Sequence, residues 1–345
     1  MRAGGLDEDG PAAQHLGTVS AVPSSGSPDF IAALVERGSK LRLDAAVADA
    51  VDRLQAVGVR TLLLKGASLD SWLYRDDGPR LYGDGDLLLA PDDIDAGHRA
   101  LRELGYTCAF DERSMPSWWR EHSSAWFRGS DGVTIDVHRS LPGVNVDDRV
   151  AWGVLSRDSA AVLVAGRSVP ALGLQARALH VVLHAAQHGA GAVVPITELE
   201  RALAVADLEL WLGTTKLAHE LDAVDAFAAG LALTDSGRKL AARLGLSPTR
   251  SVKAALHATT PPPAALGFEQ LAQADGARAR LAIVWRKLVP PPAFIRHWDP
   301  AARGSRIALA RAYARRPIWI LRHAAPGFRA WYRARRSVGG RERLP

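Results

Sequence analysis

The chain has 345 residues, of which 48% are hydrophobic and 23% charged, values typical of a globular protein that buries a substantial core. A net charge of +6 favours anionic partners such as nucleotides, nucleic acid or a membrane surface. The single Cys108 excludes an intramolecular disulfide and a cysteine-based metal cluster, and the absence of a signal peptide or a long apolar stretch favours a cytoplasmic protein.

The first part of the chain changes character three times. Residues 1–27 are rich in Gly, Ser and Pro without an apolar period, which predicts a disordered leader. From Pro28 to Val57 apolar residues recur at the spacing of two helices. Val59–Lys65 is typical of a buried strand, and the Lys65-Gly66 turn then leads into a helix over Ala67–Tyr74.

A second apolar run carries two acidic residues near its start, Asp84 and Asp86. Alternate residues of a strand point to the same face, and like charges held so close are unfavourable unless a cation lies between them. Oxygen ligands of this kind suit Mg²⁺. A third acid, Asp136, stands on the strand-like run Val133–His138, and we take the three carboxylates as the candidate active site.

The segments between these acids predict the rest of a sheet. Pro91-Asp92-Asp93 is typical of a helix start, so its acids need no catalytic role. Tyr106–Phe110 reads as a strand, and Ala125–Arg128 with Val133–His138 as a hairpin across a Gly-containing turn. This order of elements predicts a small mixed sheet backed by helices.

A strand ending in Gly, a helix, Asp-x-Asp on a strand and a lone Asp on a later strand resemble the polymerase-beta-like nucleotidyltransferase superfamily. The segments LLLKGASL, GDGDLLL and IDVH are similar to the motifs LKG, GDIDLL and DxH of a poorly characterised bacterial nucleotidyltransferase family. The resemblance covers roughly Val59–Trp211. One departure is Gly85, where that family has a branched apolar residue, and a Gly weakens the strand locally.

The resemblance implies transfer of a nucleotidyl group from an NTP to an acceptor hydroxyl or phosphate. Asp84, Asp86 and Asp136 carry over as the ligands of two Mg²⁺ ions, and Asp136 also as a candidate acceptor of the hydroxyl proton. His138 lies two residues after Asp136 and faces the same side. It either contacts nucleotide or acceptor, or orients Asp136 by a hydrogen bond, and the second role is favoured.

The resemblance also implies a nucleotide-facing turn at Lys65, Gly66 and Ser68, where backbone amides at a helix start favour phosphate. Arg80 carries over as a bidentate contact to substrate phosphate. The alternative for Arg80 is a surface ion pair with Asp76–Asp77, and the two readings are equally favoured.

Beyond residue 170 the pattern is helical, which predicts an α+β fold: a small mixed β-sheet nucleotidyltransferase domain backed by helices, then a mainly α-helical domain. The predicted divisions are a leader, a catalytic domain, a helical accessory domain and a C-terminal extension rich in Pro, Arg and aromatic residues. Their ranges are 1–27, 28–170, 171–289 and 290–345.

Two helical stretches allow additional sites. His180, His184 and His188 share one helix face, a spacing that can bind zinc, but no acid or Cys completes the set, so a polar lining of an interdomain cleft is favoured. Arg303–Arg343 interleaves Arg with aromatics, which allows contact with nucleic acid or an anionic surface. The favoured alternative is a packed helix with a solvated Arg face.

The acceptor stays open among a small molecule, a peptide, a protein and an RNA end, and specialised peptide or metabolite modification fits the resemblance. Two other functions remain open. The same metal site can serve transfer from a nucleotide sugar or another phosphate ester, because the acids specify metal and phosphate rather than the acceptor. Alternatively, the protein is a non-catalytic module that binds nucleic acid or a membrane surface.

Overall fold

The computed structural model of the chain describes residues 28–75, 78–108, 123–259 and 261–339. The predicted leader, Asp76–Asp77 and the last six residues of the C-terminal extension lie outside this range. In the described part, no helix is both long enough and apolar enough to cross a membrane.

The described strands form one mixed sheet of seven, in the order β3-β4-β5-β2-β1-β7-β6. The strands are β1 Thr61–Leu63, β2 Asp84–Leu89, β3 Tyr106–Cys108, β4 Ser123–Arg128, β5 Val133–His138, β6 Ala160–Val164 and β7 Arg167–Ala171. β2 runs parallel to β5 and antiparallel to β1, while β4 and β5 form the predicted hairpin. This sheet, backed by helices, confirms the predicted fold class.

One face of the sheet is covered by α1 (Pro28–Ala56) and α3 (Ile94–Glu103), which join it in a single apolar core. The segment Pro28–Ala56 is one continuous helix rather than the two that its apolar spacing predicted. Val47 on α1 explains the departure at Gly85, because a Cβ added there would lie 2.4 Å from Val47 Cγ2. The helix packs so closely on β2 that only Gly fits.

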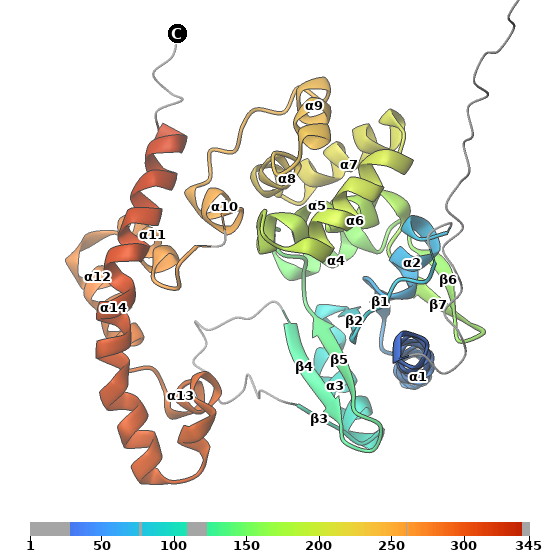
Figure 1. Ribbon diagram of the computed structural model, residues 1–345, viewed down its shortest axis with the longest axis horizontal. Coiled ribbons are helices and arrows are strands. Elements are labelled where there is room, and N and C mark those ends of the chain that lie inside the picture. The colour runs from blue at the N-terminus through green and yellow to red at the C-terminus, as the bar shows by residue number, and fades with distance from the viewer. Residues whose placement is uncertain (1–27, 76–77, 109–122, 260, 340–345) are drawn as a thin grey trace, which may run out of the picture.

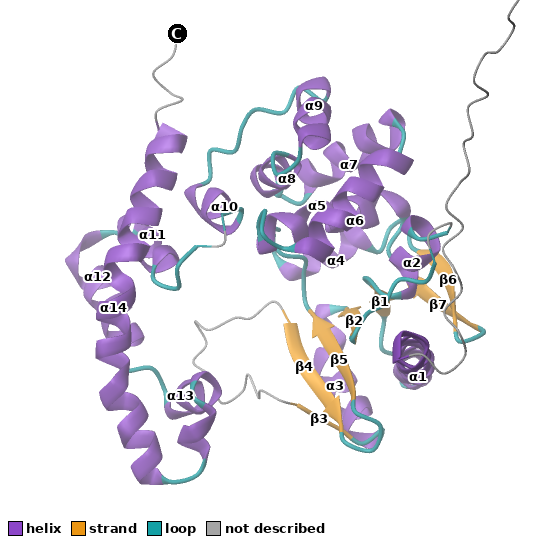
Figure 2. Cartoon of the chain, in the orientation of Figure 1, coloured by secondary structure: helices purple, strands orange, loops and turns teal. Residues whose placement is uncertain are grey.

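The other face meets the helical half of the chain. Leu62, Leu64 and Leu88 join a second core with α2 (Ala67–Leu73), α4 (Asp148–Leu155) and α5 (Leu174–His188). The following helices, which gather around α5 (Figure 1), are α6 Val193–Val205, α7 Leu208–Glu220, α8 Val224–Leu231 and α9 Asp235–Arg243. The chain after residue 170 is thus almost entirely helical (Figure 2), as predicted.

The helices that follow α9 form a further group, which is set apart from the sheet in Figure 1. They are α10 Val252–His257, α11 Ala265–Gln273, α12 Gly276–Leu288, α13 Pro292–Trp298 and α14 Arg306–Gly339. α11 and α12 are separate helices, because the chain breaks before Gly276, whose φ is +82°. An aromatic contact joins α14 to α11, with 5.4 Å between the ring centroids of Phe328 and Phe268.

Candidate active site

The three candidate acids lie together on the face of the sheet that meets α5. Side chains alternate along a strand, so Leu87 and Leu89 face α1 while Asp84 and Asp86 face the opposite side. The parallel register sets Asp86 directly opposite Asp136. Two neighbouring strands therefore bring all three carboxylates to one face, beside the helical half of the chain.

Asp86 is the most enclosed of the three and has two cationic or titratable neighbours. Its Oδ1 accepts a hydrogen bond from Lys65 Nζ at 3.0 Å and lies 2.9 Å from His138 Nε2. Burial alone would raise the pKa of Asp86, but the His138 hydrogen bond and the Lys65 charge outweigh it, so the pKa lies below its ordinary value. Asp86 is therefore a fixed negative charge at the centre of the site.

Asp84 and Asp136 are half-buried, and their pKa values are shifted upward, opposite to that of Asp86. Burial raises the pKa of Asp84, and the neighbouring charge of Asp86 raises it further. Burial and then the charge of Asp84 raise the pKa of Asp136. Both carboxylates are thus held where negative charge is costly, which is the electrostatic state that a bound cation relieves.

Asp86, Asp136 and His138 present ligand atoms that all lie within 4.8 Å of one another. Carboxylate oxygens of this kind fit Mg²⁺, and the imidazole nitrogen also suits softer divalent ions. His138 hydrogen-bonds to Asp86 and not to Asp136, the partner expected from the sequence. The parallel pairing accounts for the difference, since it sets His138 beside Leu88, two residues along β2 from Asp86.

The turn between β1 and α2 is built around Gly66. Its φ is +59°, a conformation that Gly adopts without strain, and a Cβ added there would lie 3.1 Å from Tyr82 Cε2. Tyr82 is held over the turn by a hydrogen bond to Asp44 on α1. Ser68 has a different place from the nucleotide-facing one expected, because its fully buried hydroxyl donates to the Leu64 carbonyl at 3.2 Å.

Arg80 pairs with Glu198 on α6, with 2.5 Å between Arg80 Nε and Glu198 Oε1. The side chains are 7% and 0% exposed, so this is a buried ion pair between the segment before β2 and helix α6. Arg80 Nη1 and Glu198 Oε2 are buried and have no hydrogen-bond partner. No local sequence pattern marks Glu198, because its partner is 118 residues away.

The three histidines of α5 form a ladder behind the site. The His180 and His184 rings are 6.1 Å apart, and those of His184 and His188 are 4.6 Å apart. Burial and, to a lesser extent, the charge of Lys65 lower the pKa of His180 to about 3 and that of His184 to about 2. His180 and His184 are therefore neutral at pH 7. They line the sheet side of α5 next to Lys65, and the prediction that they bind no zinc stays untested.

The nearby acids Asp92 and Asp93 make ordinary surface contacts. Asp93 accepts hydrogen bonds from Arg60, and Asp92 pairs with Arg149 at 2.6 Å. Pro91–Asp93 is a short 3₁₀ turn that leads into α3, as the sequence predicted for the start of a helix.

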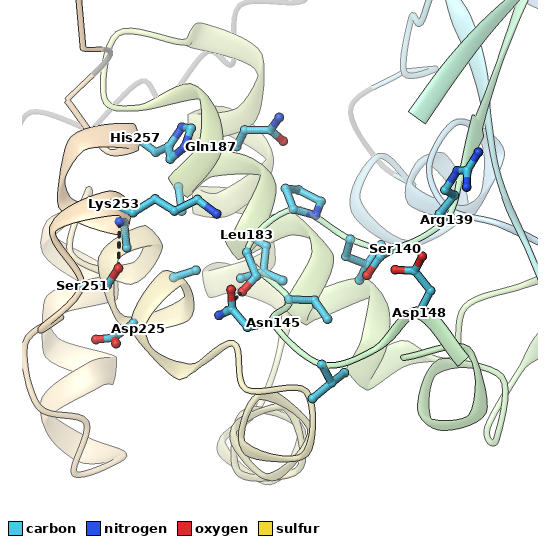
Figure 3. A pocket seen from close by; sticks show the side chains of 18 residues that line it. Arg139, Ser140, Asn145, Asp148, Leu183, Gln187, Asp225, Ser251, Lys253 and His257 are labelled. Atoms are coloured by element: carbon cyan, nitrogen blue, oxygen red, sulfur yellow. Dashed lines mark hydrogen bonds between the residues drawn. The ribbon is translucent and has the colours of Figure 1, made fainter. Parts of the chain in front are cut away.

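A cavity of about 400 Å³ opens where β5 ends (Figure 3). Arg139 and Ser140, the residues directly after His138, lie at one end of it. Gln187 on α5 and Lys253 and His257 on α10 lie at the other end. The cavity is therefore shared between the sheet domain and the helices, one residue from the candidate metal ligands.

Three solved structures resemble the chain in part. The antibiotic-resistance factor ANT(2'')-Ia is 14% identical over 53% of this chain and 96% of its own, with a TM-score of 0.36. The lincosamide antibiotic adenylyltransferase LnuA, with lincomycin bound, is 13% identical over 45% of this chain and 92% of its own, with a TM-score of 0.30. An antigenic nucleotidyltransferase-like protein from Paracoccidioides brasiliensis is 13% identical over 60% of this chain and 94% of its own, with a TM-score of 0.33. With such TM-scores these likenesses carry no weight in assigning function.

No curated protein matches the sequence. A sequence model of a family described as "Uncharacterised nucleotidyltransferase" matches residues 32–236, which is more than half of the chain and includes all three candidate acids. The chain therefore belongs to this family of nucleotidyltransferases.

Proposed function

We propose that the protein is a Mg²⁺-dependent enzyme that transfers a nucleotidyl group from an NTP to an acceptor hydroxyl or phosphate. One observation carries the proposal. The parallel pairing of β2 and β5 gathers Asp84, Asp86 and Asp136 on one sheet face, and two of these carboxylates have raised pKa values that a cation would relieve. Membership of a nucleotidyltransferase family gives that cluster a reaction class.

The three carboxylates would hold two Mg²⁺ ions, which supply charge neutralisation on the triphosphate and activation of the acceptor oxygen. His138 holds the Asp86 carboxylate in place through its hydrogen bond. Asp136 would take the proton of the acceptor hydroxyl. These roles use only groups that the two strands already bring together.

Lys65 and the Gly66 turn would meet the triphosphate. The Lys65 ammonium lies 3.0 Å from Asp86 Oδ1, so it stands at the border between the carboxylates and the turn. Gly66 allows the positive φ of this turn and leaves room for the Tyr82 ring that lies over it. Arg80 is held beside this region by the buried pair with Glu198, and we keep it as a candidate phosphate contact.

We place the acceptor in the cavity after β5. Its position one residue from His138 and its mixed polar and apolar walls suit a neutral or zwitterionic molecule with an apolar part. Figure 3 shows Arg139 and Asp148 near the sheet end and the Lys253 side chain reaching in from α10. In this arrangement the helical accessory domain, proposed to begin at residue 171, supplies half of the residues that line the acceptor cavity.

The proposal is tested by Mg²⁺-dependent thermal shift with each of the four NTPs. Asp84→Asn, Asp86→Asn and Asp136→Asn remove charge with little change of shape, so each variant should fold and lose the Mg²⁺-dependent shift. The double variant Asp84→Asn/Asp86→Asn should be little worse than the poorer single one, because the acids act as a unit. Asp92→Asn is the matched control, since Asp92 is an exposed acid paired with Arg149.

Asp84 and Asp86 variants that keep a wild-type shift while Asp92→Asn loses it would show that the site has been placed on the wrong acids. Nucleotide sugars belong in the same screen: a shift with a nucleotide sugar and none with any NTP would assign the metal site to the alternative donor. Contact of the C-terminal arginines with an anionic surface is a separate proposal, supported only by their exposure along α14.

A further inference from the structure

The C-terminal helices enclose a second cavity, of about 390 Å³, within the ~300 to 1,000 Å³ typical of small-molecule sites. Its walls come from α11 to α14 and are mainly aromatic and aliphatic. They include Phe268, Ile283, Leu288, Phe294, Trp298 and Trp319. The proposed catalytic acids do not line it, so the cavity is independent of the proposed transfer reaction.

A buried cation borders this apolar space. Arg316 on α14 is 7% exposed, whereas the other arginines of α14 are exposed. Its Nε donates to the Lys287 carbonyl at 2.7 Å, and its guanidinium carbon lies 4.8 Å from the centroid of Phe294 and 5.0 Å from that of Trp298. Arg316 Nη1 is buried and has no hydrogen-bond partner. A buried cation with an unpaired donor is costly unless an anion meets it.

Lys287 and its neighbour Arg286, both on α12, are further cations at the same cavity, and Lys287 is the one that lies against Arg316 electrostatically. Its stem crosses α11 where Gly267 leaves room, since a Cβ added to Gly267 would lie 3.3 Å from Lys287 Cε. Burial lowers the pKa of Lys287, and the charge of Arg316 lowers it further, so the two cations repel each other. Lys287 is partly open to solvent and so marks an accessible side of the cavity.

Carboxylates that could neutralise the two cations are directed elsewhere. Among the described residues, neither Arg316 nor Lys287 forms an ion pair, and no Asp or Glu lines the cavity. Glu269, the acid of α11, accepts hydrogen bonds from Trp331 Nε1 at 2.7 Å and Gln273 Nε2 at 2.8 Å. An apolar cavity at which Arg316 and Lys287 have no carboxylate partner is complementary to an apolar molecule with one anionic group.

We propose that this cavity binds an amphipathic monocarboxylate of the fatty-acid class. The carboxylate lies between Arg316 and Lys287, and the hydrocarbon chain lies among the aromatic side chains. The planar guanidinium suits a carboxylate through two parallel hydrogen bonds, and the bound anion removes the repulsion between the two cations. A purely structural role for Arg316, held by its aromatic neighbours and one backbone carbonyl, predicts no such ligand.

The test is titration of the full chain with dodecanoate below its micellar concentration, followed by tryptophan fluorescence and calorimetry. Dodecanol and dodecyltrimethylammonium are the neutral and cationic probes of the same chain length. We expect saturable one-site binding of dodecanoate, at least about tenfold tighter than either control, since a hydrogen bond to a charged group is worth that factor or more.

Two variants locate the site. Lys287→Met keeps the apolar stem, removes one cation and should weaken dodecanoate binding at least about tenfold without lowering the melting temperature. Ala324→Phe fills the cavity from α14 and should abolish binding of dodecanoate. The matched control is Arg280→Met, which removes an exposed cation of the same helix outside the cavity and should bind as the wild type does.

Three results would overturn the proposal. The first is the absence of saturable dodecanoate binding up to about 1 mM, the millimolar limit of weak association. The second is equal affinity for dodecanol, which would make the anionic group irrelevant, and the third is equal weakening by Lys287→Met and Arg280→Met, which would reduce the effect to net charge. The proposal is supported if Lys287→Met and Ala324→Phe lose dodecanoate binding while Arg280→Met keeps it.

Discussion

The buried pair of Arg80 and Glu198 should be among the most sensitive contacts in the protein. Glu198→Gln removes the negative charge and leaves the guanidinium of Arg80, 7% exposed, without a counter-ion. Removing one partner of a buried ion pair costs about 3 to 5 kcal/mol, whereas exposed pairs contribute about 0 to 1 kcal/mol. We therefore expect Glu198→Gln to lower the free energy of unfolding by about 3 to 5 kcal/mol.

The double variant Arg80→Met/Glu198→Leu removes both charges and keeps apolar volume, so it should recover most of the lost stability. Urea denaturation of Glu198→Gln, the double variant and Asp92→Asn measures these differences, with the exposed Asp92–Arg149 pair as control. A Glu198→Gln variant no less stable than Asp92→Asn would refute the reasoning. If the double variant is stable but no longer binds nucleotide, Arg80 is itself a substrate contact.

Three further predictions concern α5 and β2. The pKa of His180 is lowered by burial to about 3, so between pH 6.5 and 3 the unfolded chain binds more protons. The free energy of unfolding should therefore fall by up to about 3 kcal/mol per buried histidine from pH 6.5 to 4.5, and less in His180→Gln, in urea titrations at both pH values. Gly85→Val should cost about 1 to 3 kcal/mol in thermal melts through its clash with Val47, and a neutral effect would contradict the packing. His184→Ala should leave the zinc content unchanged in metal analysis, and loss of a full equivalent would establish a zinc site.

Local patterns predicted the strands and the shared face of Asp84 and Asp86, because alternation along a strand is a property of neighbouring residues. The hairpin before Asp136 was likewise readable from its turn. The register that sets Asp86 opposite Asp136 was not, since it depends on two strands separated by some fifty residues. The same limit explains why His138 was given the wrong hydrogen-bond partner.

Other differences have equally specific causes. Glu198 looks like any acid on a helix surface, and only the fold shows that Arg80 lies against it. Ser68 resembles a phosphate ligand by its place after Gly66, but its hydroxyl is turned to the Leu64 carbonyl at the start of α2. The break before Gly276 had a visible signal, the Asp275-Gly276 pair, which the helical spacing on both sides concealed.

Helix α1 contributes none of the proposed catalytic side chains, yet it controls how they are held. Val47 sets how closely α1 approaches β2, Asp44 fixes Tyr82 over the Gly66 turn, and Lys40 bonds to Asp70 at 3.3 Å. A shortened chain that begins at β1 would retain every proposed metal ligand and lose the support of the nucleotide turn. A random-mutagenesis screen for inactive protein should therefore return substitutions at 40–47 as a second cluster, remote in sequence from the acids.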